Sequence, residues 1–134
     1  MSIAETAGYP EIVRIVAQQQ AELIVREIEG VQAVVVATID GFEIASEIRT
    51  SLTAPRISAL ASSIAAIGEV VSSEAQLGSV RSVTIDTAAG VATIHTIRQG
   101  EDAFVLIVIA DSRALLGQIA YRTAAAARSI RAAT

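Results

Sequence analysis

The sequence contains no cysteine, no lysine and a single histidine, and only 3 % of its residues are aromatic. The absence of cysteine excludes thiol nucleophiles, zinc ribbons and disulfides. All ten basic residues are arginine, which argues against a P-loop NTPase because that motif places a lysine on the terminal phosphates. The single histidine, His95, excludes a metal site with two histidine ligands. Most routes to catalysis are therefore closed, and we expect neither a metal nor a cofactor.

The chain also lacks a long hydrophobic run and a cluster of basic charge. The apolar runs "VVVA" and "AFVLIVIA" fall far short of the roughly 20 residues that span a bilayer. The opening "MSIAETAGYP" has no basic start followed by an apolar run, as a secretory signal would have. A net charge of −4 without a basic cluster argues against nucleic-acid binding. These features predict a soluble cytoplasmic protein that does not insert into membranes.

The length of 134 residues suits one compact domain that buries about two-thirds of the surface of its unfolded chain. We expect a single domain over residues 1–134, with residues 1–9 as a loose leader and residues 10–131 folded. The hydrophobic fraction of 52 % with so few aromatics predicts a core of Ile, Val, Leu and Ala.

Hydrophobic periodicity predicts a helix, a hairpin, a second helix, a three-stranded meander and a last helix. Pro10 is well placed in the first helical turn, and Gly30 is a natural end for the first helix. An Asp-Gly pair separates strands 31–39 and 42–48, which predicts a two-residue type I′ turn with φ > 0 at both positions.

The strands of the meander are expected at residues 79–86, 91–98 and 103–110. Only strands 31–39 and 103–110 are apolar on both faces, so they belong in the middle of the sheet with helices on both sides. The fold class is therefore an α/β sandwich with an antiparallel sheet. Asp111 or Ser112 is expected to cap the last helix, whose inner side is lined by Leu115, Ile119, Ala126 and Ile130.

The segment "ISALASSIAAIGEVVSSEAQ" reads as a long helix that carries charge only at Glu69 and Glu74. A stripe suited to cover the sheet contains Ile57, Leu60, Ala61, Ile64, Ile67 and Val71. A narrow polar strip separates it from a second row of small and apolar residues, and that strip contains Ser58, Ser62, Glu69, Ser72 and Gln76. A helix with two apolar faces has two surfaces to bury against.

The second row has no partner within the monomer if the first and last helices together cover the other face of the sheet. Its small residues allow a second helix to approach closely, and the neighbouring edge strand 79–86 is open to strand addition. Both features predict a two-fold homodimer, whereas the alternative leaves the row exposed to solvent. The predicted interface consists of Ala59, Ser63, Ala66, Val70, Ser73, Leu77, Val80, Ser82 and Thr84.

The order of these elements resembles the roadblock domain, the dynein light-chain fold shared with bacterial and archaeal regulators of Ras-like GTPases. The resemblance rests on "EIEGVQAVVVATIDGFEIAS", the long helix, "SVRSVTID" and "FVLIVIADSRALLGQIAYRTAAAARSI", and covers roughly residues 11–131. It implies a profilin-like α/β sandwich whose five-stranded sheet has the order 2-1-5-4-3. One long helix covers one face of that sheet, and two helices cover the other. It also implies dimers joined through the long helices and the third strands.

Members of this family are platforms for small GTPases and bind no nucleotide themselves. The resemblance therefore implies a non-enzymatic, homodimeric interaction module that binds and regulates or scaffolds a small Ras-like GTPase. One alternative is a scaffold subunit of a signalling complex without a GTPase partner, serving a sensor kinase or a second roadblock subunit. Another is a small-ligand sensor of the PAS or GAF kind, which needs a roomy pocket with a few polar groups.

An enzyme is the third interpretation of the sequence. It would use His95 as a base with a serine or threonine and one of three carboxylates, Asp86, Asp102 or Asp111. The sequence gives no nucleophile-elbow context around these residues. A structural role for His95 therefore explains the sequence better.

Overall fold

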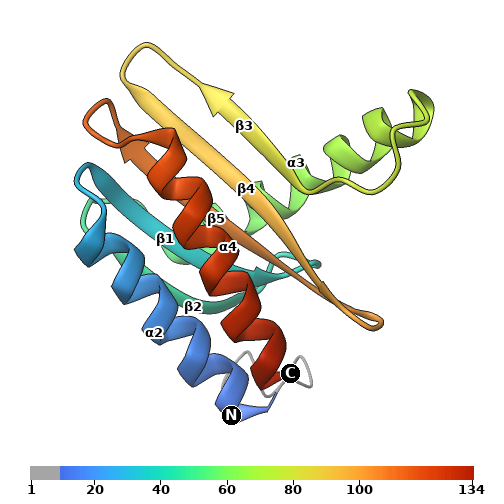
Figure 1. Ribbon diagram of the computed structural model, residues 1–134, viewed down its shortest axis with the longest axis horizontal. Helices are drawn as coiled ribbons and strands as arrows, with labels where there is room; N and C mark the ends of the chain where they lie inside the picture. Colours follow the sequence, from blue (N-terminus) through green and yellow to red (C-terminus); the bar gives the residue numbers. More distant parts are fainter. Residues whose placement is uncertain (1–9) are drawn as a thin grey trace.

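The computed structural model describes residues 10–134, so the leader expected at residues 1–9 lies outside the described residues. Three helices and five strands alternate in the expected order (Figure 1). Along the chain these are α2 Glu11–Glu27, β1 Val31–Thr38, β2 Glu43–Ile48, α3 Ala54–Glu74, β3 Ser82–Asp86, β4 Gly90–Gln99, β5 Asp102–Asp111 and α4 Leu116–Ala133.

The five strands form one antiparallel sheet in the order β2-β1-β5-β4-β3, which confirms the expected fold class and strand order. The middle strands β1 and β5 are buried along most of their length because helices cover both faces of the sheet. Figure 1 shows α2 and α4 side by side on one face and α3 crossing the other. The sandwich therefore has two hydrophobic layers, one on each side of the sheet.

The layer under α2 and α4 is built from aliphatic side chains, as the composition predicts. Ile119 and Ile130 of α4 are fully buried there, and Phe104 of β5 is the largest side chain in the layer. Leu115 was expected on the same inner side but is 63 % exposed. The helix begins only at Leu116, so the backbone of Leu115 is extended and its side chain leaves the helical stripe.

The layer under α3 confirms part of the stripe that the sequence assigned to the sheet, because Ile57 and Ala61 are buried in it and Ile64 packs against it. The residues of α3 that are buried against the sheet are small or polar for the most part, and they are Ala54, Ile57, Ser58, Ala61, Ala65 and Ser72. Of the expected stripe, Leu60, Ile67 and Val71 are instead 54 %, 63 % and 59 % exposed. Ile67 and Val71 are exposed where α3 projects past β3, and there both line an open cavity together with Val80 and Val83.

Burying serines beneath α3 costs little because their hydroxyl groups are hydrogen-bonded. Ser58 Oγ donates to the Ala54 carbonyl at 2.8 Å, and Ser72 Oγ donates to the Gly78 carbonyl. A buried polar group that keeps a partner avoids most of the desolvation penalty. The expected polar strip is therefore partly a buried face of the helix.

The hairpin between β1 and β2 has a different turn from the expected two-residue type I′. The Thr38 carbonyl accepts from Gly41 N at 2.9 Å, and the Phe42 carbonyl accepts from Thr38 N at 2.8 Å. Only Gly41 within this turn has a positive φ, of 94°. This is a three-residue loop with glycine at its left-handed position. The prediction of a hairpin at the Asp-Gly pair is therefore confirmed, whereas the predicted type I′ turn is wrong.

Candidate functional site

Helix α3 carries a group of large apolar side chains that are exposed to solvent. Ile67, Val70 and Leu77 are 63 %, 62 % and 73 % exposed, and Leu60 and Val71 join them. We call this surface the outer face of α3, made of Ala59, Leu60, Ser63, Ala66, Ile67, Val70, Val71, Ser73 and Leu77. A contiguous apolar patch of this kind marks an interaction site in soluble proteins, unlike single scattered residues.

The structure places Ala59, Ser63, Ala66, Val70 and Ser73 of the predicted interface at exposed positions of α3. Leu77, expected on the same helical row, is also exposed but follows the end of the helix at Glu74. Leu60, Ile67 and Val71 are exposed as well, although the periodicity assigned them to the stripe that covers the sheet.

Helix α3 is also long and apolar enough to cross a membrane by length and composition alone. Its best window has a mean hydropathy of 1.2, and 22 % of that window is buried within the protein. The core helix of a soluble protein passes the same test, and α3 packs on the sheet through Ile57 and Ala61. Because so little of this window is buried, most of the surface of α3 has no partner within the monomer.

The edge strand β3 provides a second unpartnered surface next to α3. It pairs with β4 alone, and its residues are exposed apart from a half-buried Val83. Ser82 and Thr84 of the predicted interface are exposed, and Val80 just before the strand is half-buried. Figure 1 shows α3 projecting beyond β3, so the end of the helix lies past the edge of its own sheet. A free strand edge and an overhanging apolar helix thus lie together at one side of the molecule.

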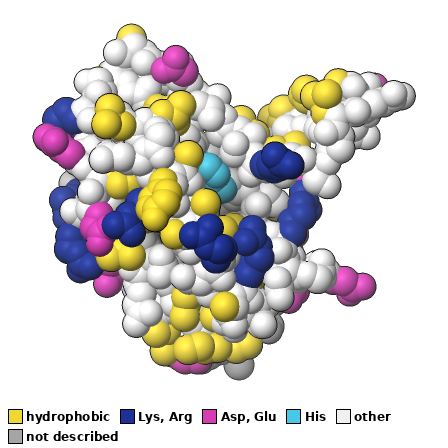
Figure 2. All heavy atoms as spheres, viewed as in Figure 1, with side chains coloured by type: hydrophobic (Ala, Val, Ile, Leu, Met, Phe, Trp, Pro, Cys, Tyr) yellow, Lys and Arg dark blue, Asp and Glu magenta, His cyan; other side chains and the backbone are white. Residues whose placement is uncertain are grey.

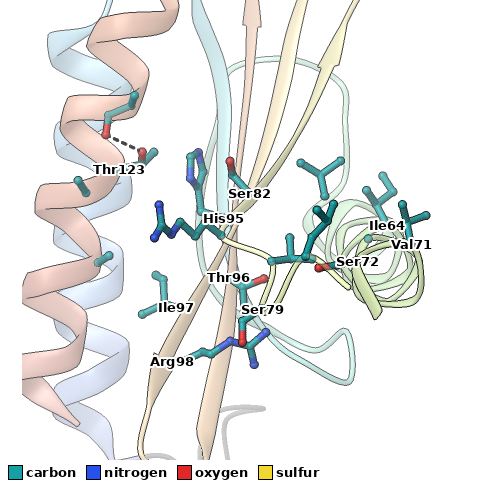
Figure 3. A pocket seen from close by; sticks show the side chains of 18 of the residues that line it. Ile64, Val71, Ser72, Ser79, Ser82, His95, Thr96, Ile97, Arg98 and Thr123 are labelled. Atoms are coloured by element: carbon teal, nitrogen blue, oxygen red, sulfur yellow. Dashed lines mark hydrogen bonds between the residues drawn. The ribbon is translucent and has the colours of Figure 1, made fainter. Parts of the chain in front are cut away.

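A large cavity of about 1500 Å³ opens at this same side, where β3 begins. Its lining comes from both faces of the sheet: Ile64 and Val71 of α3, His95 and Ile97 of β4, and small residues of α4. Figure 3 shows His95 between the strands and α4, with the α3 side chains approaching from the opposite side.

The catalytic arrangement considered for His95 is not assembled in the structure. Asp86 lies opposite Val91, and Asp102 lies opposite Gln99, each four residues along β4 from His95. At about 3.4 Å per residue, each carboxylate is therefore more than about 10 Å away along the strand. Asp111 lies opposite Gly90 and is further away still. Among the described residues, no group of three His, Asp or Glu side chains could hold a metal ion.

Burial, rather than a charged partner, determines the protonation of His95. Its Nε2 is buried without a hydrogen-bond partner among residues 10–134, as is Oγ1 of the neighbouring Thr93 on the same sheet face. Desolvation lowers the pKa of His95 from its usual 6.5. The neutral imidazole is therefore the form that the fold favours.

Replacing His95 with glutamine should weaken the dependence of stability on pH. The unfolded chain binds a proton at His95 more readily than the folded protein does, so stability falls as the pH drops below 6.5. Melting temperatures measured at about pH 7 and pH 5 should fall more in the wild type than in His95→Gln. An equal fall in both proteins would contradict this assignment, and His95→Ala is expected to leave the function of the protein intact.

Asp111, expected as a helix cap, has a different structural role. Residue Leu115 occupies the N-cap position of α4, and no side chain caps the helix there. The Asp111 carboxylate accepts from Arg113 N at 2.9 Å, from Arg113 Nη2 at 2.8 Å and from Gln32 Nε2 at 2.8 Å. These bonds join the end of β5 to the start of β1 and hold the turn that leads into α4.

The Asp111 network should make the protein sensitive to strong acid. Hydrogen bonds from Arg113, with its charge and the Gln32 amide, lower the pKa of Asp111 to about 2. This stabilisation is complete above the ordinary carboxyl pKa and is lost as the pH falls towards the folded-state value. In Asp111→Asn, the drop in melting temperature between about pH 4 and pH 2 should be smaller than in the wild type. A drop of the same size would show that Asp111 is not the responsible group.

No family model matches the chain, and no curated protein sequence matches it. Solved structures do match. The Roadblock/LC7 domain from Streptomyces avermitilis is 21 % identical, with a TM-score of 0.78 over 86 % of this chain and 94 % of that chain. MglB of Myxococcus xanthus is 17 % identical, with a TM-score of 0.74 over 92 % and 90 %. An MglB with a tetrameric arrangement is 15 % identical, with a TM-score of 0.78 over 93 % and 91 %.

These likenesses extend over nearly the whole of each chain compared, at low sequence identity. They agree with the strand order, with the helix layers and with the resemblance that the sequence patterns suggested. The chain therefore has the roadblock fold, a profilin-like α/β sandwich.

Proposed function

We propose that the protein is a homodimeric interaction module, without catalytic activity of its own, that binds and regulates or scaffolds a small Ras-like GTPase in the cytoplasm. The observation that carries this proposal is the outer face of α3 beside the free edge of β3. Two copies related by a two-fold axis would pack their α3 helices together and pair their β3 strands. Both unpartnered surfaces would then be covered in one assembly.

The chemistry of the outer face suits a helix–helix contact. Ala59, Ser63 and Ala66 give it small positions at helical spacing, where a second backbone approaches closely, and Val70 and Leu77 supply apolar area. The expected strand contact places Val80, Ser82 and Thr84 next to their copies. The MglB with a tetrameric arrangement gives support by analogy, because it shows that a protein of this fold assembles into oligomers.

The proposal of a GTPase partner rests on the resemblance of this chain to the roadblock family, so it needs a direct test. The partner should be a small Ras-like GTPase encoded near this protein in its own genome. We expect a complex in size-exclusion chromatography and a changed rate of single-turnover GTP hydrolysis when the two are mixed. Ala66→Arg, designed as a monomer, should lose the effect if the dimer is the binding unit.

Three other outcomes would each change the proposal. A complex without a change in hydrolysis would make the protein a tether rather than a regulator. The absence of both effects with every such GTPase would argue for the scaffold without a GTPase, tested next on sensor kinases and second roadblock subunits. A thermal-shift screen in which a nucleotide or cofactor raises the melting temperature would support the small-ligand sensor instead.

A further inference from the structure

The two edge strands of the sheet, β3 and β2, differ in the backbone groups that they leave unpaired. In an antiparallel ladder, every second residue of an edge strand turns its N–H and C=O groups away from the sheet. Thr96 N donates to the Arg81 carbonyl at 3.1 Å, which fixes this alternation in β3. The outward groups of β3 therefore belong to Ser82, Thr84 and Asp86. Within the described residues no hydrogen bond reaches them, so the β3 edge is open.

The outward backbone groups of β2 are occupied at the middle of the strand. Arg49 N donates to the Gln32 carbonyl at 2.8 Å, so these two residues form a hydrogen-bonded pair of the ladder. Three residues earlier, Ser46 lies opposite Val35 in a pair whose backbone groups point away from β1. Both groups of Ser46 bind the side chain of Gln18 on α2. Gln18 Nε2 donates to the Ser46 carbonyl at 2.8 Å, and Gln18 Oε1 accepts from Ser46 N at 3.1 Å.

The Gln18 amide takes the place that a neighbouring strand would fill. One bond donated to and one bond accepted from the same residue are what a strand added at this edge would form. The amide is also held in one orientation, because Gln18 Nε2 donates to Glu22 Oε1 at 3.1 Å as well. Helix α2 packs against β2 (Figure 1), and Gln18 is half-buried there. We call the two bonds between Gln18 and the Ser46 backbone the Gln18 clamp.

Other features of this side of the molecule also oppose strand addition. The register between β1 and β2 shifts at Val36 and Ala37, and such a bulge interrupts the regular edge. Figure 2 shows charged side chains of both signs over α2, whereas the projecting end of α3 carries mainly hydrophobic and uncharged side chains. Of these features, only the Gln18 clamp occupies the outward backbone groups themselves.

The side chains of β2 would tolerate pairing with a second copy of the strand. In an antiparallel pair centred on Ser46, Glu43 of one copy would lie opposite Arg49 of the other, and opposite charges across a ladder attract each other. The same would hold at the other end of the pair by symmetry. The sequence of β2 therefore does not prevent such pairing by charge repulsion, and the backbone must be closed in another way.

A sheet with two open edges would not stop at two copies of the chain. Pairing of β3 with β3 and of β2 with β2 leaves a further edge at each end, so the assembly would grow into a filament. We propose that the Gln18 clamp closes the β2 edge against a second copy of this chain, so that the sheet extends through β3 alone. The limit of two copies rests on the proposed dimer. The closure of β2 does not, because the clamp lies within one monomer.

Gln18→Ala tests the proposal, because it removes the amide and keeps a strong helix former in α2. In analytical ultracentrifugation at concentrations up to on the order of 100 µM, its mass should rise to at least about twice that of the wild type. At concentrations too low for association, the Ser46 amide should exchange its hydrogen at least about tenfold faster than in the wild type. Gln19→Ala is the matched control, at an exposed neighbour on α2 without a hydrogen bond in the described chain, and should behave as the wild type does.

The Ala66→Arg background separates the clamp from the proposed dimer. There, Gln18→Ala should form a pair through β2 and grow no further. A wild type that is monomeric would refute the proposed dimer alone, provided that Gln18→Ala still associates. A dimeric wild type together with a Gln18→Ala that stays dimeric at every concentration would refute the clamp and leave the proposed dimer standing.

Gln18→Glu separates an opened edge from a general loss of stability. Glutamate keeps an acceptor for Ser46 N but cannot donate to the Ser46 carbonyl, so the melting temperature should fall. Its charge at the edge opposes strand addition, so its mass should remain that of the wild type. Larger species of Gln18→Glu would attribute association to instability and overturn the proposal.

Two further checks locate the contact and guard against misfolding. In the larger species of Gln18→Ala, the outward amides of Ser46 and Ile48 should become protected from hydrogen exchange, and unprotected amides there would exclude β2 as the contact. If Gln18→Ala loses the circular dichroism spectrum of the wild type, Gln18→Met takes its place. It keeps the length of the side chain without the polar atoms and should associate in the same way.

Discussion

Replacing Ala66 with arginine should convert the protein from a dimer to a monomer of 13.9 kDa. Ala66 lies at the centre of the outer face of α3, is exposed in the monomer and touches neither hydrophobic layer. In the proposed dimer its side chain would meet the partner helix, so the arginine would be buried without a counter-charge. We expect the dimer dissociation constant to rise by at least about 100-fold, measured by light scattering or analytical ultracentrifugation.

Ala132→Arg is the matched control for this substitution, because it adds the same side chain at an exposed position on α4. It should leave the dimer intact, and both variants should keep the wild-type circular dichroism spectrum. Val70→Asp provides a second disruption of the same face by a different charge. A wild type that is monomeric at micromolar concentration, or an Ala66→Arg that stays dimeric, would exclude α3 as the dimer contact.

The sequence could predict which strands lie in the middle of the sheet, because a strand buried on both faces consists almost entirely of apolar residues. Strands β1 and β5 have both faces covered by helices, so nearly every side chain in them is apolar. The edge strand β3 has exposed faces, so it mixes polar and apolar residues. The strand order itself came from the family resemblance, since polarity identifies middle and edge strands but does not say which edge each one occupies.

The face that α3 turns toward the sheet could be predicted only in part, since Ile57, Ala61 and Ile64 pack there as expected but the buried serines were not anticipated. Ser58 and Ser72 are buried there because their hydroxyl groups bond to backbone carbonyls of residues 54 and 78. Periodicity counts a serine as polar wherever it lies and treats an apolar stripe as a core stripe. It cannot distinguish a surface reserved for the sheet from one reserved for a partner. For the same reason, periodicity assigned Leu60, Ile67 and Val71 to the stripe that covers the sheet, although the three side chains are exposed.

Gly90→Ala should destabilise the protein more than any other single methyl addition at its described glycines. A Cβ atom at Gly90 would lie 2.1 Å from the Ala110 carbonyl oxygen and 2.9 Å from the Asp111 Cα, both of which belong to the backbone of β5. The two strands would have to separate where β4 begins, and backbone cannot move aside as a flexible side chain can. We expect the free energy of unfolding to fall by at least about 3 kcal/mol, with a melting temperature roughly 10 °C lower.

Gly117→Ala is the matched control, since a Cβ there meets no atom within 4 Å. Gly117 is the second residue of α4, so alanine should stabilise the protein by at most about 0.5–1 kcal/mol, through higher helix propensity and a less flexible unfolded chain. Urea unfolding of both variants therefore gives changes of opposite sign from the same chemical substitution. A Gly90→Ala protein with wild-type stability would mean that β4 and β5 do not approach each other as closely at Gly90 as the structure shows. The strand register that holds β3 at the sheet edge would then need revision, and with it the strand contact of the proposed dimer.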